Sequence, residues 1–344
     1  MKKKMERIDV IVPCYNYARF LGSCVESVLS QSQVDVRLLI IDDCSSDDTA
    51  SVASTLASQD KRIQFRRHRT NVGNIDTYNE GIDWATADYL LILSADDYLL
   101  PGSLLRAASV LAAHPEVVLT CGHAAVAYED KVSPSIPPQG DMANYRVMTG
   151  QDFIMAVCAN SSHNPIWTPT AVVRTAAQQR VGGYSKTLPH AGDLHMWLRL
   201  ARIGSVAILD CYQAVYRRHG SNMHNSYAGV PNLRQHLLAF ESALAGDSSV
   251  TNTQAAMQYK RGLAMGAIRS ANHALNEKDP KGFDESVSFA LEVCPSIRHT
   301  MAWRAMQLRK LLGFRIVNAL RKAVRPVLGI VRSKLSRGIG VTPR

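Results

Sequence analysis

The chain has 344 residues, of which 46% are hydrophobic and 20% are charged, and its formal net charge is +10. This composition excludes a wholly disordered chain and suits one large α/β domain with an appendage. The basic charge is concentrated late in the sequence, because no Asp or Glu follows Glu292 while Arg and Lys recur.

The cysteines bear on the redox compartment of the protein, and the hydropathy pattern bears on signal peptides and membrane-spanning helices. The seven cysteines are scattered and form no C-x-x-C pair, which favours buried thiols in a reducing cytosol over a disulfide framework or a zinc site. No apolar segment follows the basic start before Pro13, so we expect no signal peptide. No uncharged apolar stretch reaches about 20 residues, so we expect no spanning helix.

The first part of the chain alternates buried strands with helices. Ile8–Pro13 is predicted to be a strand that ends in a polar loop, and a helix with regularly spaced apolar residues follows it. Val36–Ile41 is a second buried strand, which ends in the acidic run Asp42–Thr49. Ile63–Phe65 is a short third strand, and Asn71–Asn74 is a turn before another helix.

The stretch 88–97 is the centre of the predicted site. Leu90–Leu93 reads as a strand covered on both faces, and it runs directly into Asp96 and Asp97. Two adjacent carboxylates at such a place repel each other and lose solvation, and a divalent cation would relieve both costs. The plainer interpretation is a solvated Asp-Asp turn or a helix N-cap.

Strands alternating with helices predict an α/β fold with a doubly wound, mostly parallel sheet. Polar loops follow the first, second and fourth strands, and parallel strands bring these ends to one edge, where a nucleotide-sized pocket is expected. The loop after the first strand, Pro13–Ala18, contains no glycine. This excludes the dinucleotide fingerprint of a dehydrogenase, and the P-loop pattern is absent too.

The middle of the chain is less regular. Residues 132–140 form a Ser/Pro-rich loop, either the border of an acceptor groove or a plain surface excursion. Gln151–Ala159 suggests a helix, Thr168–Arg174 a strand and Val181–Tyr184 a turn. Gly192 and Asp193 then stand at the start of an amphipathic helix, where Asp193 by position alone is a simple N-cap.

Residues 231–300 have a helical pattern that suggests a small bundle. From 301 to 344, apolar residues interleave with Arg and Lys, which is typical of basic amphipathic helices that lie on an anionic membrane surface. Pro326 should break or kink this segment. The alternative is an exposed basic helix packed on the bundle. Nucleic acid would also fit the charge, but no recognised motif supports it, so we expect no nucleic-acid partner.

The order of these motifs resembles family 2 glycosyltransferases over about the first 225 residues. Five matching segments occur in the family's order: Val12–Asn16, Ile41–Thr49, Asn71-x-Gly73, Asn79-x-Gly81-Ile82 and Leu93–Asp97. Each is weak alone, but together they are specific. The resemblance implies the GT-A fold and a mostly inverting, metal-dependent transferase that uses a nucleoside diphosphate sugar.

Carried onto this sequence, the resemblance implies a nucleotide site. Pro13 and Tyr15 would border the base, with the Tyr15 ring as a stacking surface. Asp43, together with Asp42, would accept a hydrogen bond from the base, typically from N3–H of uracil. Near the base and ribose lie Asn71 and Gly73.

The resemblance also implies the reacting groups. Asp96 and Asp97 occupy the D-x-D site for ribose and for Mn²⁺ or Mg²⁺, but Ser94 stands where the family's first carboxylate is usual. Asp193 becomes the general base that deprotonates the acceptor hydroxyl. His219, in a segment similar to the family's Tyr-Arg-x-His, and Arg199 are possible contacts to the diphosphate or metal, and Arg199 is otherwise a brace for its helix.

The resulting hypothesis is a cytoplasmic transferase, peripheral on the inner face of the cell membrane through its C-terminal tail. It would move a sugar, UDP-linked as first choice, to a glycan or lipid-linked acceptor in bacterial surface polysaccharide synthesis. We expect domains at 1–228 (GT-A), 229–300 (helical bundle) and 301–344 (tail). One alternative is a glycosyltransferase-like binding protein without activity, which Ser94 leaves open but the presence of Asp96, Asp97 and Asp193 argues against. The other is a nucleotidyltransferase, whose glycine-rich or basic phosphate loop is missing here.

Overall fold

The computed structural model describes residues 5–128, 131–133, 136–137, 139–159, 164–220, 222, 229–246 and 253–312. The chain divides into two compact units, Met1–Tyr259 and Lys260–Arg344. This division falls later in the chain than the expected boundary after residue 228. Most of the predicted basic tail, from residue 313 on, lies outside the described residues, as do parts of the loop at 132–140 and of the segment after His219.

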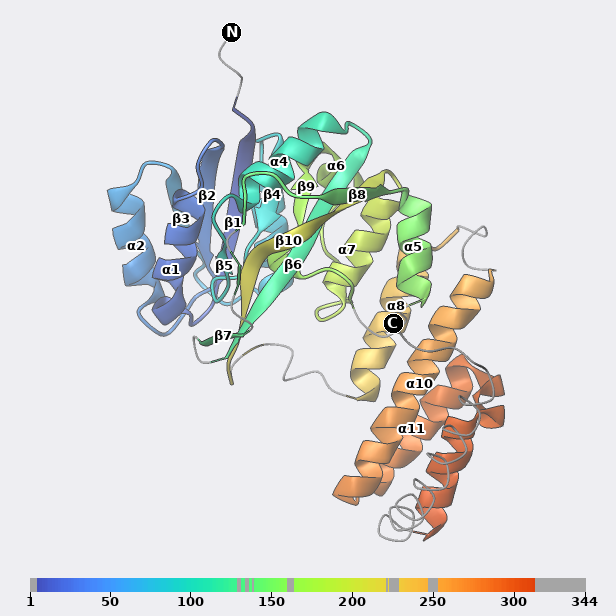
Figure 1. The fold of residues 1–344 in the computed structure, drawn as a ribbon. Coiled ribbons are helices and arrows are strands. Elements are labelled where there is room, and N and C mark those ends of the chain that lie inside the picture. Colours follow the sequence, from blue (N-terminus) through green and yellow to red (C-terminus); the bar gives the residue numbers. More distant parts are fainter. Residues whose placement is uncertain are drawn as a thin grey trace. The chain divides into compact units, whose positions relative to one another are not determined.

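Apolar runs without alternation form the centre of the sheet in the first unit. Its first four strands along the chain are β1 (Arg7–Cys14), β2 (Asp35–Asp42), β3 (Ile63–Arg67) and β4 (Tyr89–Ile92). They pair in parallel in the order β3-β2-β1-β4. Residues 10–12, 38–41 and 90–91 are almost completely buried, as expected for strands covered on both faces. This half of the sheet confirms the predicted parallel strands (Figure 1).

The other half of the sheet is mixed. The remaining strands are β5 (Tyr98–Leu99), β6 (Val117–Tyr128), β7 (Lys131–Ser133), β8 (Tyr145–Met148), β9 (Val172–Arg174) and β10 (Ser205–Arg218). β9 lies antiparallel between β4 and β6, while β6 and β10 run parallel side by side (Figure 1). Within the described residues all ten strands form one sheet. The predicted strand at 168–174 is in fact a 3-10 turn, η1 (Thr168–Thr170), followed by β9.

Helices cover both faces of this sheet. On one face, α1 (Ala18–Leu29), α2 (Thr49–Gln59) and α4 (Ser103–Ala113) share a core with alternate residues of β1 and β2, such as Val10 and Leu38. The other face carries α3 (Asn74–Trp84), α6 (Thr175–Val181) and α7 (Gly192–Ala201), which contact β1, β9 and β6 respectively. α5 (Gly150–Ala159) contacts β10 and α7.

One glycine fixes how closely α3 approaches the sheet. A Cβ at Gly81 would lie 2.3 Å from Cγ2 of Ile11 in β1, which is closer than carbon atoms can approach. Only glycine allows the helix to lie this near the strand. The N-terminal turn of α3 is thereby held next to the end of β1, where the polar loops meet.

The helical part of the chain begins with α8 (Val230–Ala243) and α10 (Gln254–Glu277), followed by α11 (Pro280–Val293), η3 (Pro295–His299) and a helix over 301–312. In the second unit, Arg309 donates to Asn272, and the Lys310 ammonium lies 4.3 Å from the centre of the Phe283 ring. Among the described residues, no helix is long and apolar enough to cross a membrane. Every cysteine is a free thiol.

Candidate active site

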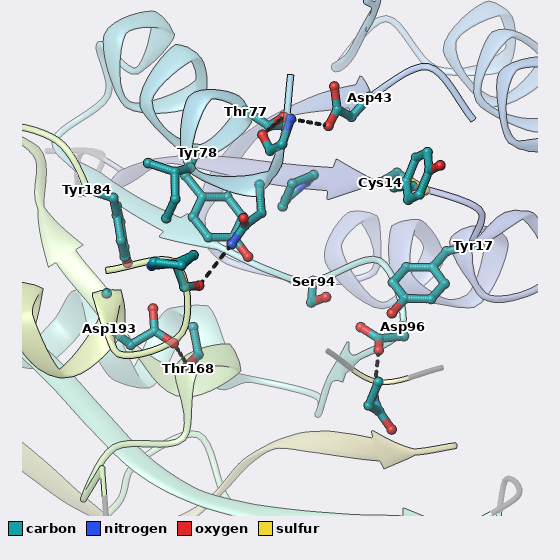
Figure 2. A pocket seen from close by; sticks show the side chains of 18 of the residues that line it. Cys14, Tyr17, Asp43, Thr77, Tyr78, Ser94, Asp96, Thr168, Tyr184 and Asp193 are labelled. Carbon is teal, nitrogen blue, oxygen red and sulfur yellow. Dashed lines mark hydrogen bonds between the residues drawn. The ribbon is translucent and has the colours of Figure 1, made fainter. Parts of the chain in front are cut away.

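The carboxyl ends of β1, β2 and β4 open into one cavity of about 610 Å³. Its walls come from these three strand ends, from the start of α3, and from later segments around Thr168, Tyr184, Asp193 and Tyr216. Figure 2 shows Asp193 beside Thr168 on one side of the cavity and Asp96 near Tyr17 on the other. The convergence of polar loops that the sequence predicts is therefore present in the structure.

The loop after β1 is fastened to the loop after β2. Asn16 has a positive φ of 58°, a conformation that asparagine tolerates better than most residues. Its backbone N–H donates to Oγ of Ser45 at 2.8 Å, and its side-chain oxygen accepts from the N–H of Ser46 at 2.8 Å. This arrangement leaves Tyr15, 48% exposed, at the wall of the cavity beside Pro13.

Asp43 organises the end of the cavity next to β1 and β2. Its backbone N–H donates to the carbonyl of Cys14, which ties the ends of β1 and β2 together. Its Oδ1 accepts from the N–H of Val72 and its Oδ2 from the N–H of Gly73, both at 2.8 Å. Gly73 has a φ of 90°, which favours glycine, and Asn71 donates to the Asp43 carbonyl.

A histidine that the sequence analysis did not single out holds the Asp43 carboxylate from the other side. The imidazole of His68 lies 2.8 Å from Oδ1 of Asp43 through Nδ1 and 2.8 Å from Oε2 of Glu80 through Nε2. Burial lowers the pKa of His68, but the hydrogen bonds to Asp43 and Glu80 outweigh it, so the pKa is raised overall. A protonated ring donates to both carboxylates at once.

Asp42 lies beneath the cavity and does not line it. Its carboxylate is fully buried, accepts from the N–H of Ser45 at 2.9 Å and lies 3.1 Å from Nε of Arg67. These contacts support the loop after β2. The structure therefore brings Asp43 to the predicted base site but not Asp42.

Asp96 and Asp97 follow β4 in a tight turn, in which the N–H of Asp97 donates to the carbonyl of Ser94. Both carboxylates are almost completely buried and both line the cavity, as does Ser94. Asp97 accepts from the N–H of Arg217 at 2.9 Å. Burial and the neighbouring Asp96 carboxylate raise the pKa of Asp97 well above its usual range. The two buried carboxylates therefore repel each other when both are ionised.

His219 reaches Asp96 from the end of β10. Its Nε2 lies 3.0 Å from Oδ2 of Asp96, and the amide of Asn222 donates to the same oxygen at 3.1 Å. The imidazole is stacked on the Phe20 ring at a centroid distance of 4.9 Å. His219 therefore stands behind the carboxylate, and Asn222 lines the cavity next to it.

Asp193 lies across the cavity from this pair. It belongs to the first turn of α7, but Ala191 is the N-cap residue, so the N-cap interpretation of Asp193 is wrong. Oγ1 of Thr168 donates to its Oδ2 at 2.7 Å. Burial raises the pKa of Asp193, and hydrogen bonds from Thr168 and Tyr184 oppose this rise. The raised pKa makes the carboxylate a better proton acceptor than an exposed one.

Tyr184 is positioned by a close backbone contact. The side-chain oxygen of Asn79 accepts from the N–H of Tyr184 at 2.6 Å, and a Cβ at Gly183 would lie 2.3 Å from that oxygen. Arg199 donates to the carbonyl of Gly183 at 2.8 Å and does not line the cavity. Arg199 thus braces the turn that carries Tyr184.

Several residues that line the cavity belong to no sequence motif and could not be predicted as site residues. Tyr78 follows the Asn71–Asn74 turn on α3, and burial and the Asp193 carboxylate raise its pKa. Thr168 and Tyr184 reach the cavity only through contacts distant in sequence. Cys14 also lines it, but burial raises the pKa of its thiol to about 12, so the thiol stays protonated and is not a nucleophile.

Among the described residues, no three His, Cys, Asp or Glu side chains gather into a complete metal site. Asp96 and Asp97 supply two carboxylates, and Mg²⁺ and its relatives are commonly held by one or two carboxylates together with the phosphates of a substrate. The carboxylate pair fits such an ion, whose positive charge would offset the repulsion between Asp96 and Asp97.

Comparisons with known proteins agree with this geometry. A family model described as glycosyl transferase family 2 matches residues 9–167. An uncharacterized glycosyltransferase of Haemophilus influenzae is 23% identical over 224 residues, which cover 64% of this chain and 68% of that protein. A GalNAc(5)-diNAcBac-PP-undecaprenol beta-1,3-glucosyltransferase of Campylobacter jejuni is 36% identical over 101 residues, or 29% of this chain and 33% of that enzyme.

Solved structures that resemble this chain identify its fold. TarS of S. aureus, residues 1–349 in complex with UDP-GlcNAc, is similar with a TM-score of 0.55 and 16% sequence identity. The likeness covers 85% of this chain and 92% of that one. This likeness shows that the chain has the GT-A fold. The family match and the relatives named as glycosyltransferases show that residues 9–167 are a family 2 glycosyltransferase domain and that the protein is a transferase.

Proposed function

We propose that the protein transfers a sugar from a nucleoside diphosphate sugar, with UDP as first choice, to a hydroxyl group of a glycan or lipid-linked acceptor, with inversion of the anomeric carbon. The observation that carries the proposal is the single cavity that Asp43, the Asp96–Asp97 pair and Asp193 share. These groups suit the three parts of such a reaction, which are the base, the diphosphate and the attacking hydroxyl.

The nucleotide end suits a uracil. The Asp43 carboxylate uses both oxygens to hold the loop at Val72 and Gly73, and a carboxylate has about four acceptor positions, so it retains capacity for the N3–H of uracil. The exposed Tyr15 ring at the cavity wall offers a face on which the base can stack. Pro13 and Asn71 border the same space.

The diphosphate belongs near the buried carboxylate pair. Mn²⁺ or Mg²⁺ would be held by Asp96 and Asp97 and would neutralise charge on the leaving diphosphate. The chain's own groups keep the pair in place, since Arg217 binds Asp97 while His219 and Asn222 bind Asp96. Ser94 lines the cavity beside them and offers a hydroxyl to the ribose in place of the family's usual carboxylate.

Asp193 is the proposed general base. Its carboxylate would take the proton of the acceptor hydroxyl as that oxygen attacks the anomeric carbon, which carries oxocarbenium character in the transition state. Thr168 and Tyr184 orient the carboxylate by hydrogen bonds. One displacement of this kind inverts the configuration.

Two further observations support a role in surface polysaccharide synthesis at the cell membrane: the name of one relative and the basic segment after residue 301. The relatives include an enzyme named for an undecaprenol-linked glucosyl transfer, which supports a role in bacterial surface polysaccharide synthesis. The predicted basic segment after residue 301 would hold the protein on the anionic inner surface of the cell membrane, next to a lipid-linked acceptor.

Isothermal titration tests the site. We expect the purified protein to bind UDP more tightly than GDP or dTDP, and only with Mn²⁺ present, and we expect Asp96→Ala to lose this binding. Asp210→Asn is the matched control, because Asp210 is exposed and pairs with His123 away from the cavity. Failure of all three nucleotides to bind would overturn the transferase site as assigned and favour the inactive binding protein.

A further inference from the structure

An aromatic side chain stands at the rim of the cavity next to Asp193. The Trp167 side chain is 37% exposed, an unusual setting for so large an apolar ring. It directly precedes Thr168, whose hydroxyl binds the Asp193 carboxylate. Trp167 itself does not line the cavity, whereas Thr168 does. The chain at Trp167 is therefore continuous with the part of the cavity wall that contacts Asp193.

Trp167 is paired with a tyrosine that reaches into the cavity. The rings of Trp167 and Tyr216 lie 5.5 Å apart between centroids at an angle of 49°. Tyr216 lines the cavity, and burial together with the carboxylates of Asp97, Asp96 and Asp193 raises its pKa. Tyr216 thus connects the Trp167 ring to the cavity that holds Asp96, Asp97 and Asp193.

The backbone holds the tryptophan in place. The carbonyl of Trp167 accepts from the N–H of Thr170 at 2.9 Å and from its hydroxyl at 2.8 Å. The Thr170 hydroxyl is also 3.2 Å from the N–H of Gly122 in β6. Pro169 lies within the same short turn and restricts it further. A ring presented by a rigid segment loses little conformational freedom when a ligand covers it.

We propose that Trp167, backed by Tyr216, is the platform of an acceptor subsite that binds a pyranose ring. The inference rests on the proposed function and adds the class of acceptor that the rim recognises. The apolar C–H face of a sugar stacks on an indole ring, as aromatic faces generally do with flat or weakly polar partners. In this proposal the reacting hydroxyl of the stacked pyranose lies on the side of Asp193, because Thr168, the residue next to Trp167, binds that carboxylate.

The assignment separates acceptor binding from donor binding. Trp167→Ala removes the stacking face but leaves Asp43, Asp96 and Asp193 in place. We expect this variant to bind UDP with Mn²⁺ as the wild type does, and to release UDP from UDP-glucose, UDP-galactose or UDP-N-acetylglucosamine with water as acceptor at the same rate. Trp167→Phe keeps a smaller ring and should retain most of the response to sugars.

The test uses methyl and octyl β-glycosides of glucose, galactose and N-acetylglucosamine as acceptor probes. We expect at least one to stimulate UDP release by the wild type, and Trp167→Ala to raise its half-saturating concentration about tenfold, with little change at saturation. Tyr145→Ala is the matched control, because Tyr145 is 40% exposed and paired with His114 away from the cavity. It should behave as the wild type.

The outcomes separate the two proposals. Loss of UDP binding by the wild type would overturn the proposed function and the subsite with it. UDP binding by the wild type without stimulation by any glycoside would overturn the subsite alone. An unchanged half-saturating concentration in Trp167→Ala would also overturn the subsite, since the ring would then not contact the acceptor. A loss of UDP binding in that variant would overturn it too, since the ring would then serve the donor site.

Discussion

The side chains around Asp193 determine how readily its carboxylate holds a proton. Burial raises the pKa, and the Thr168 and Tyr184 hydrogen bonds lower it by stabilising the ionised form. A base must be ionised to act, so activity should be present above this pKa and be lost as the pH falls through it. Stability has the opposite sign, because the cost of burying the ionised carboxylate is fully present above the folded pKa and decreases as the pH falls from there toward the unfolded value of about 3.9.

The first prediction concerns Thr168→Val, which removes a hydroxyl without changing the shape of the side chain. The Asp193 pKa should rise, so the acid limb of kcat/KM should move to higher pH. Asp193→Asn should lower kcat by about 10²- to 10⁴-fold and leave the melting temperature unchanged or higher. Thr55→Val, at an exposed site on α2, is the control. An acid limb that stays in place in Thr168→Val would contradict the role of the hydroxyl.

The second prediction concerns His68, which faces Asp43 from the end of β2 and Glu80 from α3, while Arg66 of β3 binds Glu80. Its raised pKa means that the imidazolium stabilises the fold fully below the unfolded value of about 6.5 and loses this effect as the pH rises through the folded value. A neutral ring donates to only one carboxylate, so the Asp43 loop should loosen.

Measurements of UDP affinity at several pH values test this role of His68. The affinity of the wild type should fall above neutrality, before uracil itself loses its N3 proton, while His68→Gln should bind more weakly throughout and without that dependence. His123→Gln is the control, since His123 is exposed and pairs with Asp210 outside the cavity. The same pH profile in His68→Gln and the wild type would exclude His68 as the source.

At the scale of elements, β1 is anchored at the end opposite the cavity by a buried carboxylate. Asp9 is fully buried and accepts from Nε and Nη2 of Arg37 at 2.8 and 2.7 Å. It also accepts from the backbone N–H groups of Thr86 and Ala87 at 2.7 and 2.8 Å. One side chain thus joins β1, β2 and the loop before β4.

The third prediction follows from this network. Asp9→Ala strands buried donors and should lower the free energy of unfolding by about 3–5 kcal/mol, measured by urea denaturation with tryptophan fluorescence. The folded fraction should still bind UDP, because the network lies away from the cavity. Asp35→Ala, at an exposed position at the start of β2, should cost far less. A small effect of Asp9→Ala would show that the network is not important for stability.

The elements also show what a sequence can and cannot predict. Leu90–Leu93 and Val36–Ile41 are continuous apolar runs that end in carboxylates, so both the buried strands and the polar edge can be predicted from local pattern alone. β9 could not be, because Val172, Val173 and Arg174 contain no information on strand direction. The residues that bind Asp193 could not be predicted either, because Thr168 contacts its carboxylate only when η1 and α7 pack together.

At the scale of the whole molecule, the basic segment at 301–344 is the remaining predicted feature. The fourth prediction is that the full chain sediments with vesicles that contain phosphatidylglycerol but not with pure phosphatidylcholine vesicles, and that high salt releases it. Replacing Arg321, Lys322 and Arg325 by Gln should weaken the binding, whereas Lys61→Gln and Lys186→Gln should not. Equal binding to both kinds of vesicle would contradict an electrostatic attachment.

The residues that line the cavity are far apart in the sequence, so they leave the ribosome at different times during synthesis. Asp43, Gly73 and Asp96 all belong to the first four parallel strands and their loops, whereas Asp193 comes much later. At translation rates of about 5–20 residues per second, the base would leave the ribosome roughly 5 to 20 s after the nucleotide-recognising half. Arg217, His219 and Asn222, which hold the carboxylate pair, leave the ribosome later still, so the proposed donor site is completed only after the proposed base has emerged.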